Sequence, residues 1–407
     1  MNITAIICEY NPLTNGHVKH LKCAKEETNC DAIFCIMSGS FTQRGDAAIL
    51  DKYIRAELAI MNGADIVVEL PTVFSTSPAD NFAIGAMRII ALIPNINCLS
   101  FGSECGDIEK LQEIAKIIFE EPEEYKDILR KKLDEGLSFP KARAESLKIY
   151  IENNNLNKDL TDIIDSPNNI LAISYINAAK ELKLNINFHT VARNNNYASE
   201  NLEEELPSAM AIRSALYNDK KHLIEKSVPK NVYNTLLQYR PRLFALGDII
   251  LFKIRSLNGY DFAKYYDVSG GVHNRIKIAA EKSNSYEELL ENSKNKNITL
   301  SRIKRICIYA LLDITQSLYE EILKAPAYIQ ILAINKNLKD NLLSCLSSYT
   351  SNVLTRYSDI NRVDKSLRAS IKLDFTAQGV LNIANKNKKL PRSMIIIERN
   401  NQIENDC

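Results

Sequence analysis

Short apolar runs alternate with helix-like segments along the first 210 residues, and this alternation constrains the fold more than any other feature of the sequence. The apolar runs lie at residues 3–8, 31–39, 65–70, 97–102 and 186–193. Segments of helical composition separate them, such as 50–63, which ends at Gly63. The pattern predicts an α/β fold with a Rossmann-like parallel sheet, in which ligands bind at the carboxyl ends of the strands.

Two stretches differ from this pattern. Residues 107–160 are rich in Glu and Lys and have helical composition, so we interpret them as a helical insertion. From about residue 218 onward strand signals become sparse, and amphipathic segments such as 300–323 dominate. We therefore expect an α/β domain over residues 1–220 and a mainly α-helical domain over residues 221–407.

The two halves of the chain carry opposite charge. Residues 211–407 contain 31 Lys and Arg against 19 Asp and Glu, a net charge of +12, while the whole chain carries +1. Residues 1–210 therefore carry −11. A basic half joined to an acidic half indicates a module that binds a polyanion. Compositional drift between two domains is the alternative.

Nine Cys, none of them spaced as C-x-x-C, argue against zinc ribbons and thioredoxin-like redox pairs. The segment MNITAIICEYNP lacks the basic stretch and the cleavage site of a signal peptide. No apolar run approaches the roughly 18 residues that a membrane helix needs. We expect a cytoplasmic protein whose Cys are reduced and mostly buried.

Residues 8–20, CEYNPLTNGHVKH, lead from the first predicted strand into the first predicted helix. Within them, Thr14, Asn15, Gly16 and His17 form a T-x-G-H motif. Unpaired N–H groups and a partial positive charge let a helix N-terminus bind anions, and a glycine there lets a phosphate approach the backbone. His17 can donate a ring N–H to a phosphate oxygen on which charge develops. The motif predicts a phosphate site; a surface loop with an incidental His is the alternative.

The motif and several further segments resemble one family. H/T-x-G-H after a first strand is the signature of the nucleotidyltransferase superfamily. The bacterial tRNA(Met) cytidine acetate ligases share, in the same order, segments similar to 38–50, 68–87, 101–104, 166–176 and 208–216. The resemblance covers residues 1–220 and continues more loosely into 270–276 and 298–306. Thr14 stands where His is common in that family, so His17 is the better candidate for a phosphate ligand.

The resemblance implies an enzyme that activates acetate with ATP, which gives acetyl-adenylate and pyrophosphate. The enzyme would then acetylate the exocyclic amine of the wobble cytidine in elongator tRNA(Met). Mg²⁺ would accompany the ATP phosphates; neither a protein ligand for the metal nor a protein partner can be named. Acetate has a pKa near 4 and is already ionised at neutral pH, so the first step needs positioning and charge neutralisation but no general base.

The resemblance also implies the residues of the site. His17, Lys19 and Arg44 would act in catalysis. ATP would contact Ile7, Cys8, Glu9, Tyr10, Asn11, Pro12, Leu13, Thr14, Asn15, Gly16, His17, Val18, Lys19, His20, Gly102, Asn168 and Arg193. Acetate or the leaving pyrophosphate would meet the loop that contains Ser38, Gly39, Gln43 and Arg44.

Several of these assignments have a structural alternative. Lys19 could instead be a solvated lysine, and His20 could be a packing residue. Asn168 could instead cap a helix, and Arg44 could form an ion pair with Asp46. Arg193 directly follows a predicted strand, so we expect it at the carboxyl edge of the sheet. Ser208 and Arg213 open a later helix and resemble the S-x-x-x-x-R element that holds phosphates in related transferases.

Basic clusters in the second half are candidates for the tRNA surface. One cluster contains Lys294, Lys296, Arg302, Lys304 and Arg305, and the other contains Lys386, Lys388, Lys389 and Arg392. Such clusters bind the phosphate backbone electrostatically. We expect Arg302, Lys304, Arg305, Lys388 and Lys389 to contact tRNA; a solvated charged face is the alternative for each cluster.

Two other functions remain open at this point. A nucleotidyltransferase that joins ATP to a phosphate-bearing small molecule would need the T-x-G-H motif equally, but it would not need a basic helical half. A non-enzymatic RNA-binding protein built on an old nucleotide fold would not need an intact motif. Pyrophosphate release from ATP with acetate, with phosphate esters and with neither distinguishes all three.

Overall fold

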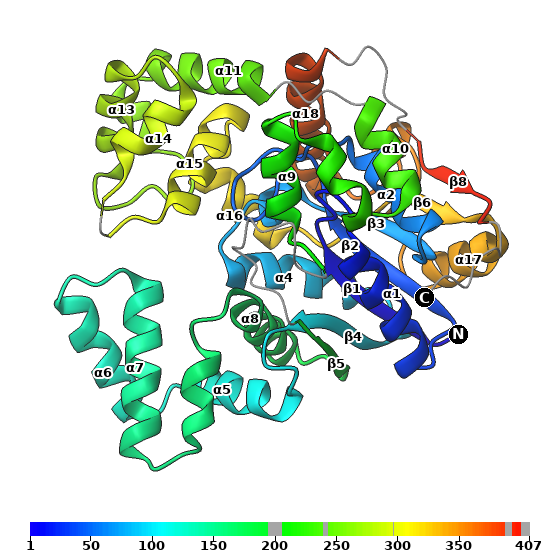
Figure 1. Ribbon diagram of the computed structural model, residues 1–407, viewed down its shortest axis with the longest axis horizontal. Helices are drawn as coiled ribbons and strands as arrows, with labels where there is room; N and C mark the ends of the chain where they lie inside the picture. The colour runs from blue at the N-terminus through cyan, green and yellow to red at the C-terminus, as the bar shows by residue number, and fades with distance from the viewer. Residues whose placement is uncertain (194–205, 239–242, 296, 387–392, 400–407) are drawn as a thin grey trace.

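The computed structural model describes residues 1–193, 206–238, 243–295, 297–386 and 393–399. A sheet of eight described strands forms its centre (Figure 1). The strands are β1 (Ile3–Cys8), β2 (Ala32–Ser38), β3 (Ile66–Leu70), β4 (Ile96–Ser103), β5 (Asn187–Ala192), β6 (Ile329–Asn335), β7 (Val353–Leu354) and β8 (Ile395–Ile397). Their order across the sheet is β5-β4-β1-β2-β3-β6-β7, and β8 pairs with β6.

The five strands expected from the sequence are present as β1 to β5, and all of them pair in parallel. Ile6 on β1, for example, lies opposite Cys35 on β2 and Ser100 on β4. Strands that run in the same direction bring their carboxyl ends to one edge of the sheet. The predicted α/β fold class is therefore confirmed, and the T-x-G-H motif lies at this edge.

Helices pack around the sheet in the first half of the chain. They are α1 (Asn15–Glu27), α2 (Lys52–Met61), α3 (Thr72–Ser75), α4 (Ala79–Ile90), α8 (Pro167–Glu181) and α9 (Ala209–Tyr217). The predicted insertion is helical, as expected, and contains α5 (Ile108–Glu120), α6 (Glu123–Asp134), α7 (Phe139–Asn153) and a 3-10 turn at Lys158–Ile163. Helices α6 and α7 pack against each other and project away from the sheet (Figure 1).

The second half is mainly helical. Its helices are α10 (Lys230–Gln238), α11 (Leu243–Ser256), α12 (Gly259–Phe262), α13 (Val272–Lys282), α14 (Tyr286–Ser293), α15 (Leu300–Leu312), α16 (Gln316–Lys324), α17 (Lys339–Tyr349) and α18 (Arg368–Asn385). In Figure 1, α11 and α13 to α15 gather in one group above the α6–α7 pair. None of the described helices is long and apolar enough to span a membrane.

Two features of the second half go beyond what the sequence predicted. The amphipathic segment 300–323 forms two helices, because Asp313 adopts a left-handed conformation (φ 56°) between α15 and α16. The buried segment Ile329–Asn335 forms a strand, β6, which runs antiparallel to β3. The second half thus completes the sheet of the first half, while the functional division near residue 220 stays a prediction.

A buried ionic network joins the C-terminal helix to this sheet. Nζ of Lys52 on α2 lies 2.8 and 2.6 Å from the carboxylate oxygens of Glu69 on β3. Asp374 on α18 accepts hydrogen bonds from the N–H of Thr72, at 2.7 Å, and from the hydroxyl of Tyr328. Burial raises the pKa of Glu69 to about 7 and also raises the pKa of Asp374, while Lys52 acts in the opposite direction on both.

Replacing Lys52 with Met should lower the free energy of unfolding by about 3–5 kcal/mol, because two buried carboxyl groups lose their cation. Glu69 has a raised pKa in the folded state, so its protonation contributes stability that is fully present below its ordinary pKa of 4.5 and is lost as the pH rises through about 7. The Lys52→Met variant depends more on protonated Glu69 than the wild type does. The difference in free energy of unfolding between wild type and variant should therefore be larger at pH 8 than at pH 6. Urea denaturation at both pH values measures the difference.

The matched control is Lys22→Met, which changes an exposed lysine of α1. Its free energy of unfolding should change by less than about 0.5 kcal/mol. A similar small change for Lys52→Met would mean that the network does not stabilise the fold.

Candidate functional site

A cavity of about 650 Å³ opens at the carboxyl edge of the sheet. The ends of β1 and β4, the start of α1, the insertion and the start of α15 contribute to its walls. The expected site residues that line it are Ile7, Cys8, Glu9, Tyr10, Asn11, His17, His20, Gln43, Arg44, Gly102, Asn168, Arg193, Arg213 and Arg305. Segments distant in sequence thus meet in one concave site, the kind of place where small-molecule ligands bind.

The first turn of α1 holds His17 in one orientation. Thr14 is the N-cap of this helix: its hydroxyl accepts a hydrogen bond from the N–H of His17 at 3.4 Å, and its own N–H donates to Nδ1 of His17 at 3.0 Å. Nδ1 is therefore an acceptor, and in the neutral imidazole the proton is on Nε2. Burial lowers the pKa of His17 to about 3, and Arg193 and His20 contribute to this shift. His17 is thus a neutral hydrogen-bond donor in the cavity wall at physiological pH.

Arg193 extends across the end of β4, where Gly102 has no side chain. A Cβ at Gly102 would lie 2.8 Å from Cδ and 2.9 Å from Nε of Arg193. The guanidinium donates to the side-chain oxygen of Asn168 at 3.1 Å, and the Asn168 amide donates to the carboxylate of Glu104 at 2.8 Å. These contacts position Arg193 at the cavity. In this structure the missing side chain of Gly102 makes room for the Arg193 side chain.

Asn168 does not cap a helix, which was the alternative for this residue. Helix α8 begins at Pro167 and has Ser166 at its N-cap. Instead, the carboxylate of Glu104 accepts from the backbone N–H groups of Asn168, at 3.2 Å, and Asn169, at 2.9 Å. A side chain from outside the helix therefore satisfies the first free N–H groups of α8, and the Asn168 side chain remains at the cavity.

A buried carboxyl group lies in the same wall as several cations. Glu9 accepts a hydrogen bond from the N–H of Gln43 at 2.8 Å. Burial raises the pKa of Glu9, and the nearby charges of Arg213 and Arg44 oppose that rise. Arg213 also donates to the carbonyl oxygen of Asn11 at 2.7 Å. The cavity therefore offers Arg44 and Arg213 on one side and His17 with Arg193 on another.

Ser38 and Gly39 are not among the residues that line the cavity. Arg55 on α2 is fully buried and donates to the carbonyl oxygens of Glu9 at 2.6 Å, Ser38 at 3.0 Å and Gly39. A Cβ at Gly39 would lie 2.2 Å from Oε1 of Glu69. Of the expected second-substrate loop, only Gln43 and Arg44 reach the cavity; Ser38 and Gly39 form the support behind them.

Part of the segment around the T-x-G-H motif does not line the cavity. Lys19 is exposed on α1, and the structure does not bring it to the cavity. Asn15 donates its side-chain amide to the carbonyl oxygen of Lys226, in the 3-10 helix Lys221–Ser227, at 2.8 Å. The expected ATP-binding residues outside the cavity lining are Pro12, Leu13, Thr14, Asn15, Gly16, Val18 and Lys19. Ser208 caps α9 by accepting a hydrogen bond from the N–H of Ala211 at 3.0 Å.

The first basic cluster does not form one exposed surface. Arg302 pairs with Asp267 at 3.1 Å, and Lys304 pairs with Asp46 at 2.7 Å. Arg305 is only 7% exposed and lines the cavity. The expected residues Lys296, Lys388, Lys389 and Arg392 lie outside the described residues.

Sequence reasoning missed the outer wall of the cavity. The residues in question are Phe139, Lys141 and Arg143 at the start of α7, and Thr299 and Ser301 at the start of α15. The Phe139 side chain is 52% exposed, and the Arg143 guanidinium lies 5.8 Å from its ring centroid. An exposed aromatic side chain among basic residues is typical of surfaces that stack nucleic-acid bases. Residues 139–143, FPKAR, contain this combination of an aromatic and basic residues, but we interpreted the segment only as an insertion.

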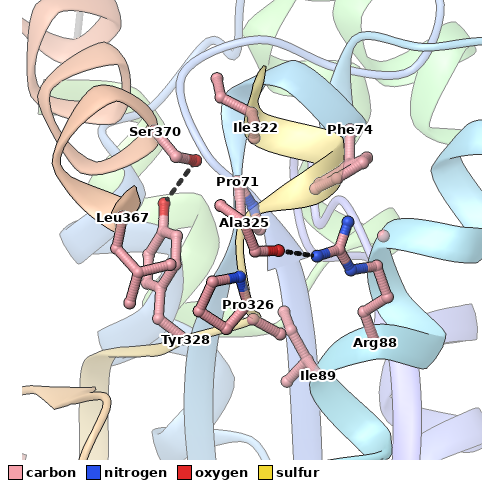
Figure 2. Close-up of a pocket in the computed structure, with 12 residues that line it drawn as sticks. Pro71, Phe74, Arg88, Ile89, Ile322, Ala325, Pro326, Tyr328, Leu367 and Ser370 are labelled. Carbon is pink, nitrogen blue, oxygen red and sulfur yellow. Dashed lines mark hydrogen bonds between the residues drawn. The ribbon is translucent and has the colours of Figure 1, made fainter. Parts of the chain in front are cut away.

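A second cavity, of about 10 Å³, lies where α4, α16 and α18 meet (Figure 2). Arg88 donates to the carbonyl oxygen of Ala325, and the hydroxyl of Tyr328 lies 3.1 Å from that of Ser370. A space of this size holds about one water molecule. It is a packing feature between these helices and offers no room for a substrate.

Comparisons with known proteins agree with this geometry. The family model described as HIGH Nucleotidyl Transferase matches residues 1–394. A tRNA(Met) cytidine acetate ligase of Thermoanaerobacter sp. (strain X514) is 36% identical over 397 residues, which cover 96% of this chain and 97% of that one. The protein of the same name from Clostridium perfringens is also 36% identical, over 97% and 98% of the two chains.

Solved structures agree as well. The crystal structure of apo Thermotoga maritima TmcAL superposes with a TM-score of 0.91 at 30% identity and covers 98% of this chain and 100% of its own. The same protein bound with α-thio ATP superposes with a TM-score of 0.90 at 31% identity. The chain therefore belongs to the tRNA(Met) cytidine acetate ligase family of the HIGH nucleotidyl transferases.

Proposed function

We propose that this chain is an ATP-dependent ligase that acetylates the wobble cytidine of elongator tRNA(Met). The observation that carries the proposal is the 650 Å³ cavity, in which His17 and Arg193 lie at the carboxyl edge of the sheet while Phe139 lies at the outer wall. The inner part suits a nucleotide triphosphate and the outer part suits an unstacked base. The relatives named above act on the same substrate by name, and the TmcAL structure with α-thio ATP supports a nucleotide in this fold.

In the first step, an acetate oxygen attacks the α-phosphorus of ATP and pyrophosphate leaves. Acetate is already an anion, so the site needs no base here; it needs charge neutralisation and alignment. The N-terminus of α1, the Nε2–H of His17 and the Arg193 guanidinium would neutralise the phosphates. Arg44 and Arg213 would orient acetate or the leaving pyrophosphate. Lys19, which we also expected to act in catalysis, would have to move to take part.

Mg²⁺ would accompany the triphosphate in this proposal, held by phosphate oxygens and water. No group of three metal-binding side chains occurs among the described residues. Asp80, Asp165 and Glu9 line the cavity as single carboxyl groups.

In the second step, the cytidine amine attacks the acetyl carbon and AMP leaves. The base must leave the stack of the anticodon loop to reach the cavity. Phe139 would stack on it or on a neighbour, and Lys141 would contact the backbone. The basic half, residues 221–407, would hold the rest of the tRNA, with Lys388 and Lys389 as expected contacts. Work on tRNA would place the protein in the cytoplasm.

The test of the function is direct. The protein with ATP and acetate should release pyrophosphate, and it should do so far faster than with phosphate esters or with neither. Mass analysis of tRNA treated with the protein, ATP and labelled acetate should show one added acetyl group on the wobble cytidine. Pyrophosphate release with a phosphate ester, in preference to acetate, would instead indicate a small-molecule nucleotidyltransferase.

Replacing His17 with Ala should slow acetyl-adenylate formation by about 100-fold or more, the effect of losing one donor to developing charge. The loss of the Nδ1 acceptor costs α1 only part of its cap, so the circular dichroism spectrum should remain that of the wild type. Single-turnover adenylate formation provides the measurement. A near-normal rate in the folded variant would remove His17 from the mechanism.

Between pH 8 and pH 6 the rate of adenylate formation should change by less than about twofold. The pKa of His17 lies near 3, so His17 stays a neutral donor throughout this range, and acetate stays ionised. Single-turnover rates across the range provide the measurement. A tenfold fall per pH unit on the acid side, retained in His17→Ala, would indicate an unrecognised base.

Replacing Phe139 with Ala should weaken tRNA binding by about 10-fold, the scale of one lost stacking contact. Adenylate formation should be unchanged. Phe119→Ala, which removes a similarly exposed aromatic side chain (48% exposed) that does not line the cavity, serves as the control. Filter binding to unmodified tRNA measures both, and equal effects of the two variants would contradict the assignment.

A further inference from the structure

Four polar side chains form a hydrogen-bonded chain that the mechanism above does not use. Nε2 of His20 on α1 lies 2.9 Å from Oγ of Ser100 on β4. The same Oγ lies 2.9 Å from Nδ1 of His189 on β5. Nε2 of His189 lies 2.9 Å from Oε2 of Glu27 at the end of α1. Three consecutive contacts thus connect four groups from three elements.

The chain leads from the cavity to solvent. His20 lines the cavity, and Ser100 is fully buried. The side chain of His189 is 16% exposed and that of Glu27 is 57% exposed. Ser100 and His189 are register partners of adjacent strands, while His20 and Glu27 are two turns apart on the same face of α1. The helix and the sheet therefore fix both ends of the chain and its centre.

The chemistry of the four groups gives the hydrogen bonds one direction. An ionised carboxylate accepts only, so His189 donates Nε2–H to Glu27, and its Nδ1 is then the acceptor in the neutral ring. The hydroxyl of Ser100 donates to that Nδ1 and accepts from Nε2–H of His20. Nδ1 of His20 is left with its lone pair, and no described group is hydrogen-bonded to it. The hydrogen bond from His189 lowers the pKa of Glu27, which keeps this carboxylate ionised.

We propose that this chain, His20–Ser100–His189–Glu27, is the path by which the amine of the acceptor cytidine loses its proton during acetyl transfer. The inference rests on the proposed function and supplies the base that the second step needs. The amine nitrogen forms a bond to the acetyl carbon, the bond from that carbon to the phosphate oxygen breaks, and AMP leaves with the electron pair. Nδ1 of His20 takes the amine proton.

One proton enters the chain at His20 and one proton leaves it at Glu27. His20 releases its Nε2 proton to Ser100 as it gains one at Nδ1, Ser100 passes its own to Nδ1 of His189, and His189 passes its Nε2 proton to Glu27. Glu27 then returns the proton to solvent. The side chains return to their starting state when the tautomers reset.

A relay suits His20 better than action as a lone base. Burial, together with the charges of Arg193 and His189, lowers its pKa to about 3. His17 also adjoins it on α1, where its own pKa is affected by His20. Because a cationic His20 is unfavourable, it can accept a proton only if it gives one up in the same event. The alternative role is structural, in which the chain only fastens α1 to β4 and β5.

The experiment compares Glu27→Gln with Glu26→Gln. Both residues are exposed neighbours near the end of α1, but of the two only Glu27 bonds to His189. Transfer of acetyl from preformed acetyl-adenylate to tRNA should be about 10-fold slower in Glu27→Gln and unchanged in Glu26→Gln. Adenylate formation, followed by pyrophosphate release, should be unchanged in both. Ser100→Ala should slow transfer by about 100-fold.

The outcomes separate the possible readings. If the four groups only fasten α1 to β4 and β5, their loss should lower the rates of adenylate formation and of acetyl transfer together. Such a parallel loss in Ser100→Ala and Glu27→Gln would overturn the relay. Unchanged transfer in both variants would overturn it too. A solvent deuterium isotope effect on transfer that disappears in Ser100→Ala would support it. If the wild type makes no acetyl-adenylate or does not acetylate tRNA, the proposed function fails instead.

Discussion

The buried guanidinium of Arg55 is the contact on which the rest of the site depends. It donates to the carbonyl oxygens of Glu9, Ser38 and Gly39, which end β1 and β2 or directly follow them, and to that of Leu50 at 3.1 Å. One rigid, planar cation thus supplies hydrogen-bond donors to four carbonyl groups. The loops that carry the T-x-G-H motif and Arg44 are therefore fixed at their roots, although both are irregular in structure.

The structure gives the cations and acids of the cavity different tasks. Glu104 holds Asn168 and the start of α8, and through Asn168 it positions Arg193. Glu9 shares a wall with Arg44 and Arg213, and its burial favours the neutral acid. Positive charge is thus concentrated where phosphates would lie, while the Glu104 carboxylate is occupied by backbone N–H groups and Glu9 is disfavoured as an anion.

The sequence predicted the parts of the fold that depend on local pattern. The five parallel strands, the insertion and the start of α1 all carry strong periodicity or a turn signal, and all are present. Sequence reasoning did not place β6: Ile329–Asn335 is a short apolar run in the half that we expected to be mainly helical, and its pairing with β3, β7 and β8 is not visible in the sequence. It also could not show that Arg302 and Lys304 pair with Asp267 and Asp46, because a charge cluster in sequence says nothing about partners from distant segments.

The antiparallel pairing of β6 with β3 has a consequence for synthesis on the ribosome. The strands β1 to β5 are complete once residue 192 has been made, but the edge of β3 stays unpaired until residues 329–335 leave the exit tunnel. That edge belongs to a wholly buried strand of mainly apolar residues, and an unpaired strand edge of this kind can pair with another chain. The edge of β3 therefore stays unpaired while some 140 further residues are synthesised. Slow translation of these residues, or premature termination within them, would favour aggregation.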